Sequence, residues 1–140
     1  VMKPIMEGLQ ATPEDFNEYA WMALMQRPVS NRVVDIARQA FDETEGGDRS
    51  IAHTLACVYA ATGKPREARD LLLKSMTRGA GEEPNDSAWY GFGLIAEAYG
   101  DVESARAYYA RVAKPAETLI PASSLYAMSQ ARLVALTKRH

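Results

Sequence analysis

The sequence is poor in cysteine and has no long apolar run, and each shortage excludes a class of protein. Cys57 is the only cysteine among the 140 residues, which excludes an internal disulfide and a zinc site built from cysteines. No apolar stretch approaches the roughly 20 residues that a membrane-spanning helix needs. Residues 1–11 (VMKPIMEGLQA) lack the apolar core of a secretory signal peptide, so we expect no such signal here.

The chain also lacks a surplus of positive charge. Its 16 lysines and arginines stand against 18 aspartates and glutamates, which gives a net charge of −2. Surfaces that bind nucleic acids or anionic membranes need clustered positive charge. We therefore expect neither nucleic-acid binding nor direct membrane insertion, and we expect no cofactor. The sequence names no compartment; a soluble, cytoplasmic protein is the default expectation, and a periplasmic one is not excluded.

What the chain does contain is typical of helices. Hydrophobic residues make up 47% of it, enough for a packed core. β-Branched residues are sparse, alanine and leucine are common, and glycine and proline fall in clusters about one helix length apart. This pattern predicts an all-α protein of about seven helices. The predicted helices begin at residues suited to helix starts, namely Thr12, Ser30, Asp48, Pro65, Asn85 or Asp86, Asp101, and Ser123 or Ser124.

The predicted helices form pairs that recur along the chain. At an offset of 37 residues, Gly63 and Ala68 match Gly100 and Ala105, and a further copy lies 35 residues upstream. Small residues at such positions allow the two helices of a pair to cross closely. A single pair cannot bury its own apolar face, so the pairs are expected to stack.

The second and third copies resemble the tetratricopeptide repeat (TPR) family. Residues 55–76 (LACVYAATGKPREARDLLLKSM) carry the Leu-Ala-x-x-Tyr of a first helix, the turn glycine and the Ala-x-x-x-large pattern of a second helix. Residues 89–112 (WYGFGLIAEAYGDVESARAYYARV) match as well, but Ala96 stands where the family usually has an aromatic residue. Residues 14–47 are a weaker copy, with Trp21 at a position typical of glycine or alanine and Val33 replacing the usual alanine.

This resemblance implies a right-handed α-solenoid of antiparallel helix pairs. Residues 1–11 would be an N-terminal extension and residues 12–140 a single domain. The repeats would cover about 14–47, 49–84 and 86–115, and the helix over 123–138 would be a solvating cap.

In TPR proteins the first helix of each pair lines a concave groove that binds a partner peptide. Carried over position by position, the resemblance places nine residues in this groove: Glu18, Tyr19, Met22, Met25, His53, Cys57, Tyr90, Leu94 and Glu97. Met128 or Arg132 of the last helix would close the end of the groove. The positions that match the family's carboxylate clamp hold no Lys, Arg or Asn, so an apolar or mildly basic peptide or helix is the better match. The alternative for Met22, Met25 and Leu94 is that they belong to the core.

The sequence thus predicts a non-catalytic protein–protein interaction module. One alternative is an interaction or assembly segment of a larger bacterial multidomain protein. Another is a small-ligand or metal site around His53 and Cys57, which lie four residues apart on one helix face. The oligomeric state stays open, and self-association is a third alternative because Trp21, Phe41 and Tyr108 cannot all be placed in a core.

Overall fold

The computed structural model describes residues 11–77 and 84–138, and within these ranges the chain is all-helical, as predicted. The seven helices of these two ranges are α2 (Pro13–Ala23), α3 (Asn31–Glu43), α4 (Arg49–Ala61), α5 (Pro65–Thr77), α6 (Asp86–Ala98), α7 (Val102–Ala110) and α8 (Leu125–Thr137). None of the helices in the described ranges is long and apolar enough to cross a membrane. Most of the predicted extension 1–11 lies outside the described residues, as do residues 78–83 at the end of the second predicted repeat.

Side-chain caps fix where most of the helices begin. Asp48 and Asn85 each accept a hydrogen bond from the backbone N–H three residues on. Asp101 and Ser124 do the same for α7 and α8. Thr12 and Asp15 form a reciprocal capping box at α2. Ser30 also stands at an N-cap, but its side chain makes no capping hydrogen bond.

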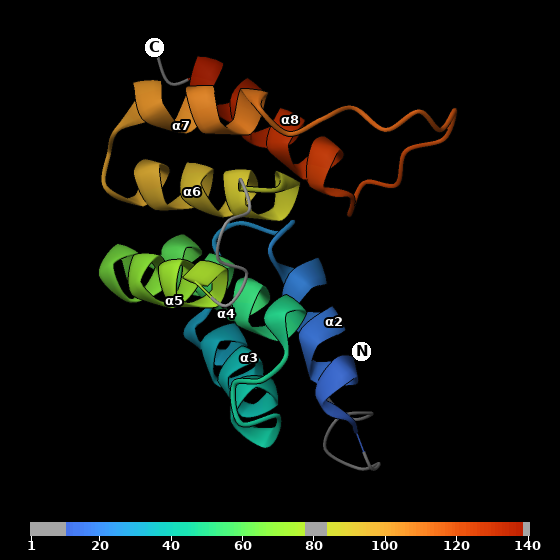
Figure 1. The fold of residues 1–140 in the computed structure, drawn as a ribbon. Coiled ribbons are helices and arrows are strands. Elements are labelled where there is room, and N and C mark those ends of the chain that lie inside the picture. Colours follow the sequence, from blue (N-terminus) through green and yellow to red (C-terminus); the bar gives the residue numbers. More distant parts are fainter. Residues whose placement is uncertain (1–10, 78–83, 139–140) are drawn as a thin grey trace.

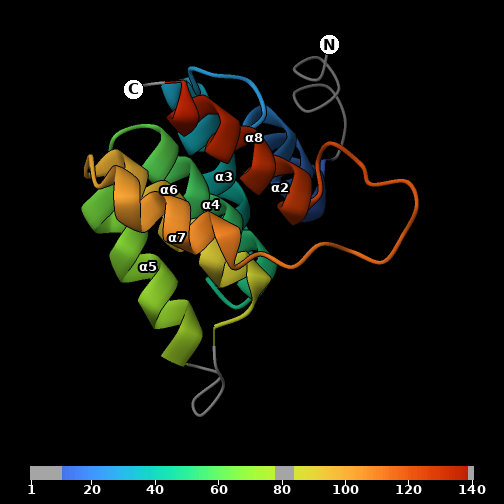
Figure 2. The same ribbon diagram turned by 90° about the horizontal axis from the view of Figure 1, so that it is seen from above.

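The helices pack as antiparallel pairs that stack on one another (Figure 1). The pairs are α2 with α3, α4 with α5, and α6 with α7, and α8 packs against α6 and α7. The first helices α2, α4 and α6 also contact their neighbours in the stack, whereas the second helices α3 and α5 do not approach one another closely. Figure 1 shows α7 and α8 at one end of the stack, and in Figure 2, which is seen from above, α7 lies in front of α6.

The turn between the two helices is built in the same way in the second and third units. Lys64 N–H donates to the Tyr59 carbonyl at 2.8 Å, and Asp101 N–H donates to the Ala96 carbonyl at 2.9 Å. In both turns the residue before the donor is a glycine with positive φ, +83° for Gly63 and +84° for Gly100. The same C-cap, 37 residues apart, is a structural counterpart of the sequence repeat.

The first helix of the first unit has a different register from the one predicted. Its N-cap Thr12 lies 36 residues before Asp48, so the predicted offset of 35 is one residue too small in this helix. The offset of 35 fits the second helix, where Val33 and Ala37 are buried as their matches Ala68 and Leu72 are. In the corrected register Ala20, which is 0% exposed, takes the small-residue position, and Trp21 matches Cys57 instead of Ala56.

Small residues at the helix crossings set the spacing of the pairs, as the repeat predicts. Ala68 and Ala105 are both 0% exposed. A Cβ atom placed on Gly93 would overlap the ring of Tyr109, so α6 and α7 approach closely only because position 93 has no side chain. A Cβ atom on Gly91 would come within 2.9 Å of Leu72 Cδ2, which shows the same constraint between the second and third units.

We expect Ala105→Leu to lower the free energy of unfolding by about 1–3 kcal/mol, because the extra side chain would overpack the crossing of α6 and α7. The matched control is Ala107→Leu, since Ala107 lies on the same helix and is exposed. Urea denaturation followed by circular dichroism measures both. Equal stability of the Ala105→Leu variant and the wild type would contradict the crossing described here.

Candidate functional site: closed first-helix face and open α3–α5 groove

The corrected register defines the face of α2, α4 and α6 that corresponds to the predicted groove. We call it the first-helix face; its residues are Asn17, Trp21, His53, Cys57, Tyr90 and Leu94. Trp21 lies across this face, with its ring centroid 5.8 Å from that of His53 and 5.6 Å from that of Tyr90. One side chain of the first unit thus contacts both the second and the third unit.

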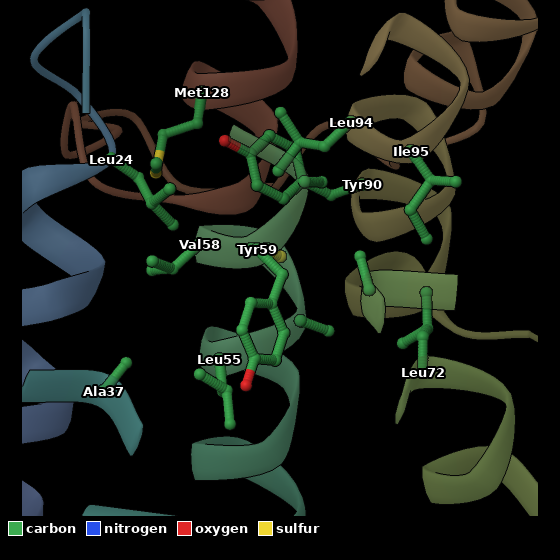
Figure 3. Close-up of a cluster of buried hydrophobic side chains, with 14 of the residues drawn as sticks. Leu24, Ala37, Leu55, Val58, Tyr59, Leu72, Tyr90, Leu94, Ile95 and Met128 are labelled. Atoms are coloured by element: carbon green, nitrogen blue, oxygen red, sulfur yellow. The ribbon is translucent and has the colours of Figure 1, made fainter. Parts of the chain in front are cut away.

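Two further parts of the chain complete the cover over this face. They are the segment just before α8 and the helix α8. Trp21 Nε1 donates a hydrogen bond to the Ser123 carbonyl at 2.9 Å, so the chain just before α8 is tied to α2. Met128 of α8 is 4% exposed, and Figure 3 shows it beside Leu24 of α2 and Tyr90 of α6. The first-helix face is therefore filled by the chain's own side chains.

A largely buried ion pair holds α8 in this place. Arg132 of α8 binds the Glu97 carboxylate through both Nε and Nη2, and the Tyr109 hydroxyl donates to Glu97 Oε1 at 2.8 Å. Burial opposes ionisation of Glu97, but the hydrogen bonds from Arg132 and Tyr109 outweigh it and leave the pKa of this carboxyl below its ordinary value. Glu97 is thus engaged within the fold, joining α6, α7 and α8.

Burial corrects part of the predicted groove. Cys57, Tyr90 and Leu94 are only 1–2% exposed and belong to the hydrophobic core, so they do not line an open groove. Met128 is likewise a core residue of the described structure. The cause is the cover formed by Trp21 and α8, which repeat alignment alone does not reveal.

The other predicted groove residues lie nearer to solvent. Glu18, Met22 and Met25 are exposed, and Tyr19 is half-buried. For the groove residues of α2, the predicted offset of 35 is one residue too small. One residue corresponds to a rotation of about 100° around a helix. In the corrected register Asn17 and Trp21 lie on the first-helix face instead. The positions of the N-caps Thr12, Asp48 and Asn85 carried the signal for the correct register.

The contacts of His53 and Cys57 define what this pair can do chemically. His53 Nε2 lies 2.6 Å from the Ser87 carbonyl and 3.6 Å from Cys57 Sγ. A carbonyl only accepts hydrogen bonds, so Nε2 carries the proton and cannot take one from the thiol. Burial lowers the pKa of His53 below its ordinary value, and the bond to Ser87 offsets this only in part. Within the described residues, no group of three or more His, Cys, Asp and Glu side chains is placed to hold a metal ion.

We expect the stability of the protein to fall as the pH drops below about 6.5, the ordinary pKa of histidine. The unfolded chain then binds a proton at position 53 that the folded chain, with its lowered pKa, does not bind. His53→Gln should flatten the dependence of the unfolding free energy on pH between about pH 6.5 and pH 5. A His140→Gln variant is the control for the second histidine; an equally steep profile in His53→Gln would contradict the assignment.

We also expect Cys57 to resist alkylation in the folded protein. Burial raises the pKa of its thiol, the positive charge of Arg27 lowers it only slightly, and the thiolate is the reactive form. Iodoacetamide at about pH 8 should modify the thiol only after denaturant is added, as mass spectrometry would show. Rapid modification of the native protein would contradict this burial and revive the alternative of a nucleophilic site.

An open hollow lies elsewhere, between the second helices α3 and α5. We call it the α3–α5 groove; its volume is about 600 Å³. Its lining comes from α3, α4 and α5 and consists of Arg38, Phe41, Asp42, Leu55, Tyr59, Glu67, Asp70, Leu71 and Lys74. A second hollow of about 230 Å³ shares Phe41, Leu71 and Lys74 with it and continues toward Arg49 at the start of α4. The two hollows together form one elongated depression.

The floor of the α3–α5 groove is built from the core and its rim from exposed charges. Leu55 and Tyr59 of α4 are buried, and Phe41 and Leu71 are half-buried. The Tyr59 hydroxyl accepts a hydrogen bond from Arg38 Nη2, and the Arg38 guanidinium lies 5.7 Å from the centroid of the Tyr59 ring. The repeat pattern placed binding residues on first helices alone, so the prediction did not include this groove. A sequence signal for the groove is Phe41, an aromatic residue of α3 that is only half-buried.

Comparisons of the chain with protein-family models, with curated proteins and with solved structures gave no match.

Proposed function

We propose that the chain is a TPR-like protein–protein interaction module that binds a short segment of a partner protein in the α3–α5 groove. The observation that carries this proposal is the groove itself, a hollow of about 600 Å³ with an apolar floor between two helices that do not pack together. Grooves of this kind between helices are suited to apolar side chains of a bound peptide or helix.

The shape of the groove favours an elongated segment of a protein over a compact small molecule. The groove continues through Phe41 and Leu71 into the second hollow, so a bound chain could place apolar side chains in both. Phe41 and Leu71 are half-buried, which leaves part of each side chain available to such a partner. Burying this surface in a complex would supply the hydrophobic part of the binding energy.

The charges at the rim indicate the character of the bound segment. Asp42, Glu67 and Asp70 supply three negative charges along the α3–α5 groove, against two positive charges from Arg38 and Lys74. This balance favours an apolar or mildly basic segment, which is the partner chemistry that the sequence suggests. A partner with several acidic residues would meet a net repulsion at this rim.

A non-catalytic role agrees with the state of the His53–Cys57 pair. The imidazole nitrogen nearest the thiol donates to the Ser87 carbonyl, and burial disfavours both the thiolate and the imidazolium. The pair is thus suited to packing within the stack, and the α3–α5 groove carries the proposed function.

The binding test starts from a library of short peptides selected on the immobilised wild-type protein. The affinity of selected peptides is measured by fluorescence anisotropy. Leu71→Glu should weaken their binding at least about tenfold, because it places a charge on the apolar floor. Asp70→Lys, a change at an exposed rim residue, should weaken basic peptides selectively.

The matched control is Leu73→Glu. Leu73 is 44% exposed and lies two residues from Leu71, on the other side of α5, so binding should be unchanged. Met22→Glu tests the exposed edge of α2 in the same assay. Loss of binding in Met22→Glu but not in Leu71→Glu, or no peptide selected at all, would refute the α3–α5 groove as the binding site.

A further inference from the structure

The connection between α7 and α8 is long and carries an exposed leucine. Residues 111–124 form no helix, and connections of this length without secondary structure are usually binding loops, lids or linkers. Leu119 is 86% exposed, more than any other large hydrophobic side chain among the described residues. We call residues 114–121 (KPAETLIP) the projecting segment. Figure 1 and Figure 2 both show it extending beyond α2, away from α5.

The chain is fixed on both sides of the projecting segment. The Ala113 N–H before it donates to Asp86 Oδ1 at 3.3 Å, and the Ser123 carbonyl after it accepts the hydrogen bond from Trp21. Between these points, no backbone–backbone hydrogen bond among the described residues involves residues 114–120. A segment that is held at both ends loses less conformational freedom on binding than a free tail does.

The projecting segment presents charges as well as the leucine. Glu117 lies two residues before Leu119 and is exposed, and Lys114 is exposed three residues earlier still. When such a segment binds in an extended conformation, Glu117 and Leu119 lie on the same side, about 6.6 Å apart. The segment therefore offers, in order, a positive charge, a negative charge and an apolar side chain.

The α3–α5 groove offers groups of complementary character in the reverse order. Its apolar floor includes Phe41 and Leu71, and Lys74 follows Leu71 by about one turn of α5. The second hollow, which begins at these residues, adds Glu45 and Arg49. From the floor outward, an apolar surface is thus followed by positive charge and then by one further charge of each sign.

The length of the depression suits a segment of this size. Its lining on α5 extends from Glu67 to Ser75, which is about 12 Å of helix. About four residues of extended chain span this distance. Residues 117–120 would fill it, and the rest of the projecting segment would cross the rim.

We propose that the projecting segment of one copy of this chain binds in the α3–α5 groove of a second copy. Leu119 packs on the apolar floor, and Glu117 then faces Lys74. Lys114 lies beyond, toward Glu45 of the second hollow. The segment has no net charge, so it avoids the repulsion that an acidic segment meets at the rim. This inference rests on the proposed function, because it takes the groove as the binding site and names its occupant.

The positions of the two surfaces determine the form of the assembly. The projecting segment cannot enter the groove of its own chain, because the two lie on different sides of the stack (Figure 2). Each contact leaves one segment and one groove unused, so association is head-to-tail and continues beyond a dimer. The contact is smaller than a standard stable interface of roughly 1,200–2,000 Å², so we expect it to be weak and reversible.

Sedimentation velocity on the full chain over about 5–500 µM tests the proposal. The average mass of the wild type should rise above the 15.4 kDa of the monomer with concentration. Leu119→Glu and Leu71→Glu should each stay monomeric, because each puts a charge into the apolar contact. Their equimolar mixture should form a heterodimer and nothing larger, since one variant keeps its groove and the other its segment. A folding defect in either variant could not produce this result.

A charge exchange tests the orientation of the segment. Glu117→Lys should weaken self-association, because it places like charges together at Lys74. Adding Lys74→Glu to the same chain should restore it. Leu73→Glu, an exposed change on the other side of α5, is the control and should associate like the wild type.

A wild type that stays monomeric at 500 µM would overturn the proposal. Association that persists in Leu119→Glu or Leu71→Glu would do the same, as would a mixture of the two that stays monomeric. The peptides selected for the groove are measured separately on Leu119→Glu, which keeps the groove intact. If they bind there while the wild type stays monomeric, the proposed function stands and only the second copy is refuted as the occupant.

Discussion

The close approach of α6 and α7 at Gly93 is the constraint on which the C-terminal half of the structure depends. The ring of Tyr109 occupies the space that a side chain at position 93 would need. This packing carries the Tyr109 hydroxyl to Glu97, and Glu97 in turn binds Arg132 of α8. With Arg132 turned inward, α8 lays Met128 against the first-helix face.

The two sides of the stack therefore differ in how open they are to solvent. The first-helix face, where the resemblance to TPR proteins predicted a groove, is covered by Trp21 and α8. Among the residues that the structure describes, nothing comparable covers α3 and α5. These two helices lie apart and leave buried core residues as the floor of a groove. Which side of the stack is open thus depends on which helices fail to pack together, as well as on which residues the repeat aligns.

Local signals in the sequence were sufficient for the helices and for their pairing. The caps Asp48, Asn85, Asp101 and Ser124 act through hydrogen bonds within one turn, so their positions can be read without knowing the fold. Side-chain contacts between different units could not be predicted in this way. Whether Tyr90 is open or buried depends on Trp21, 69 residues earlier, and the predicted repeat alignment was one residue off at Trp21.

The hydrogen bond from Trp21 to the Ser123 carbonyl joins residues 102 positions apart in the chain. In an open array each unit touches only its neighbours, so units can fray from either end while the others stay folded. Here the first unit is fastened to the segment before the last helix, and its loss would also uncover His53 and Tyr90 in the middle units. The first unit and the segment before the last helix are thus in direct contact. This contact favours unfolding in one cooperative step over stepwise loss of units.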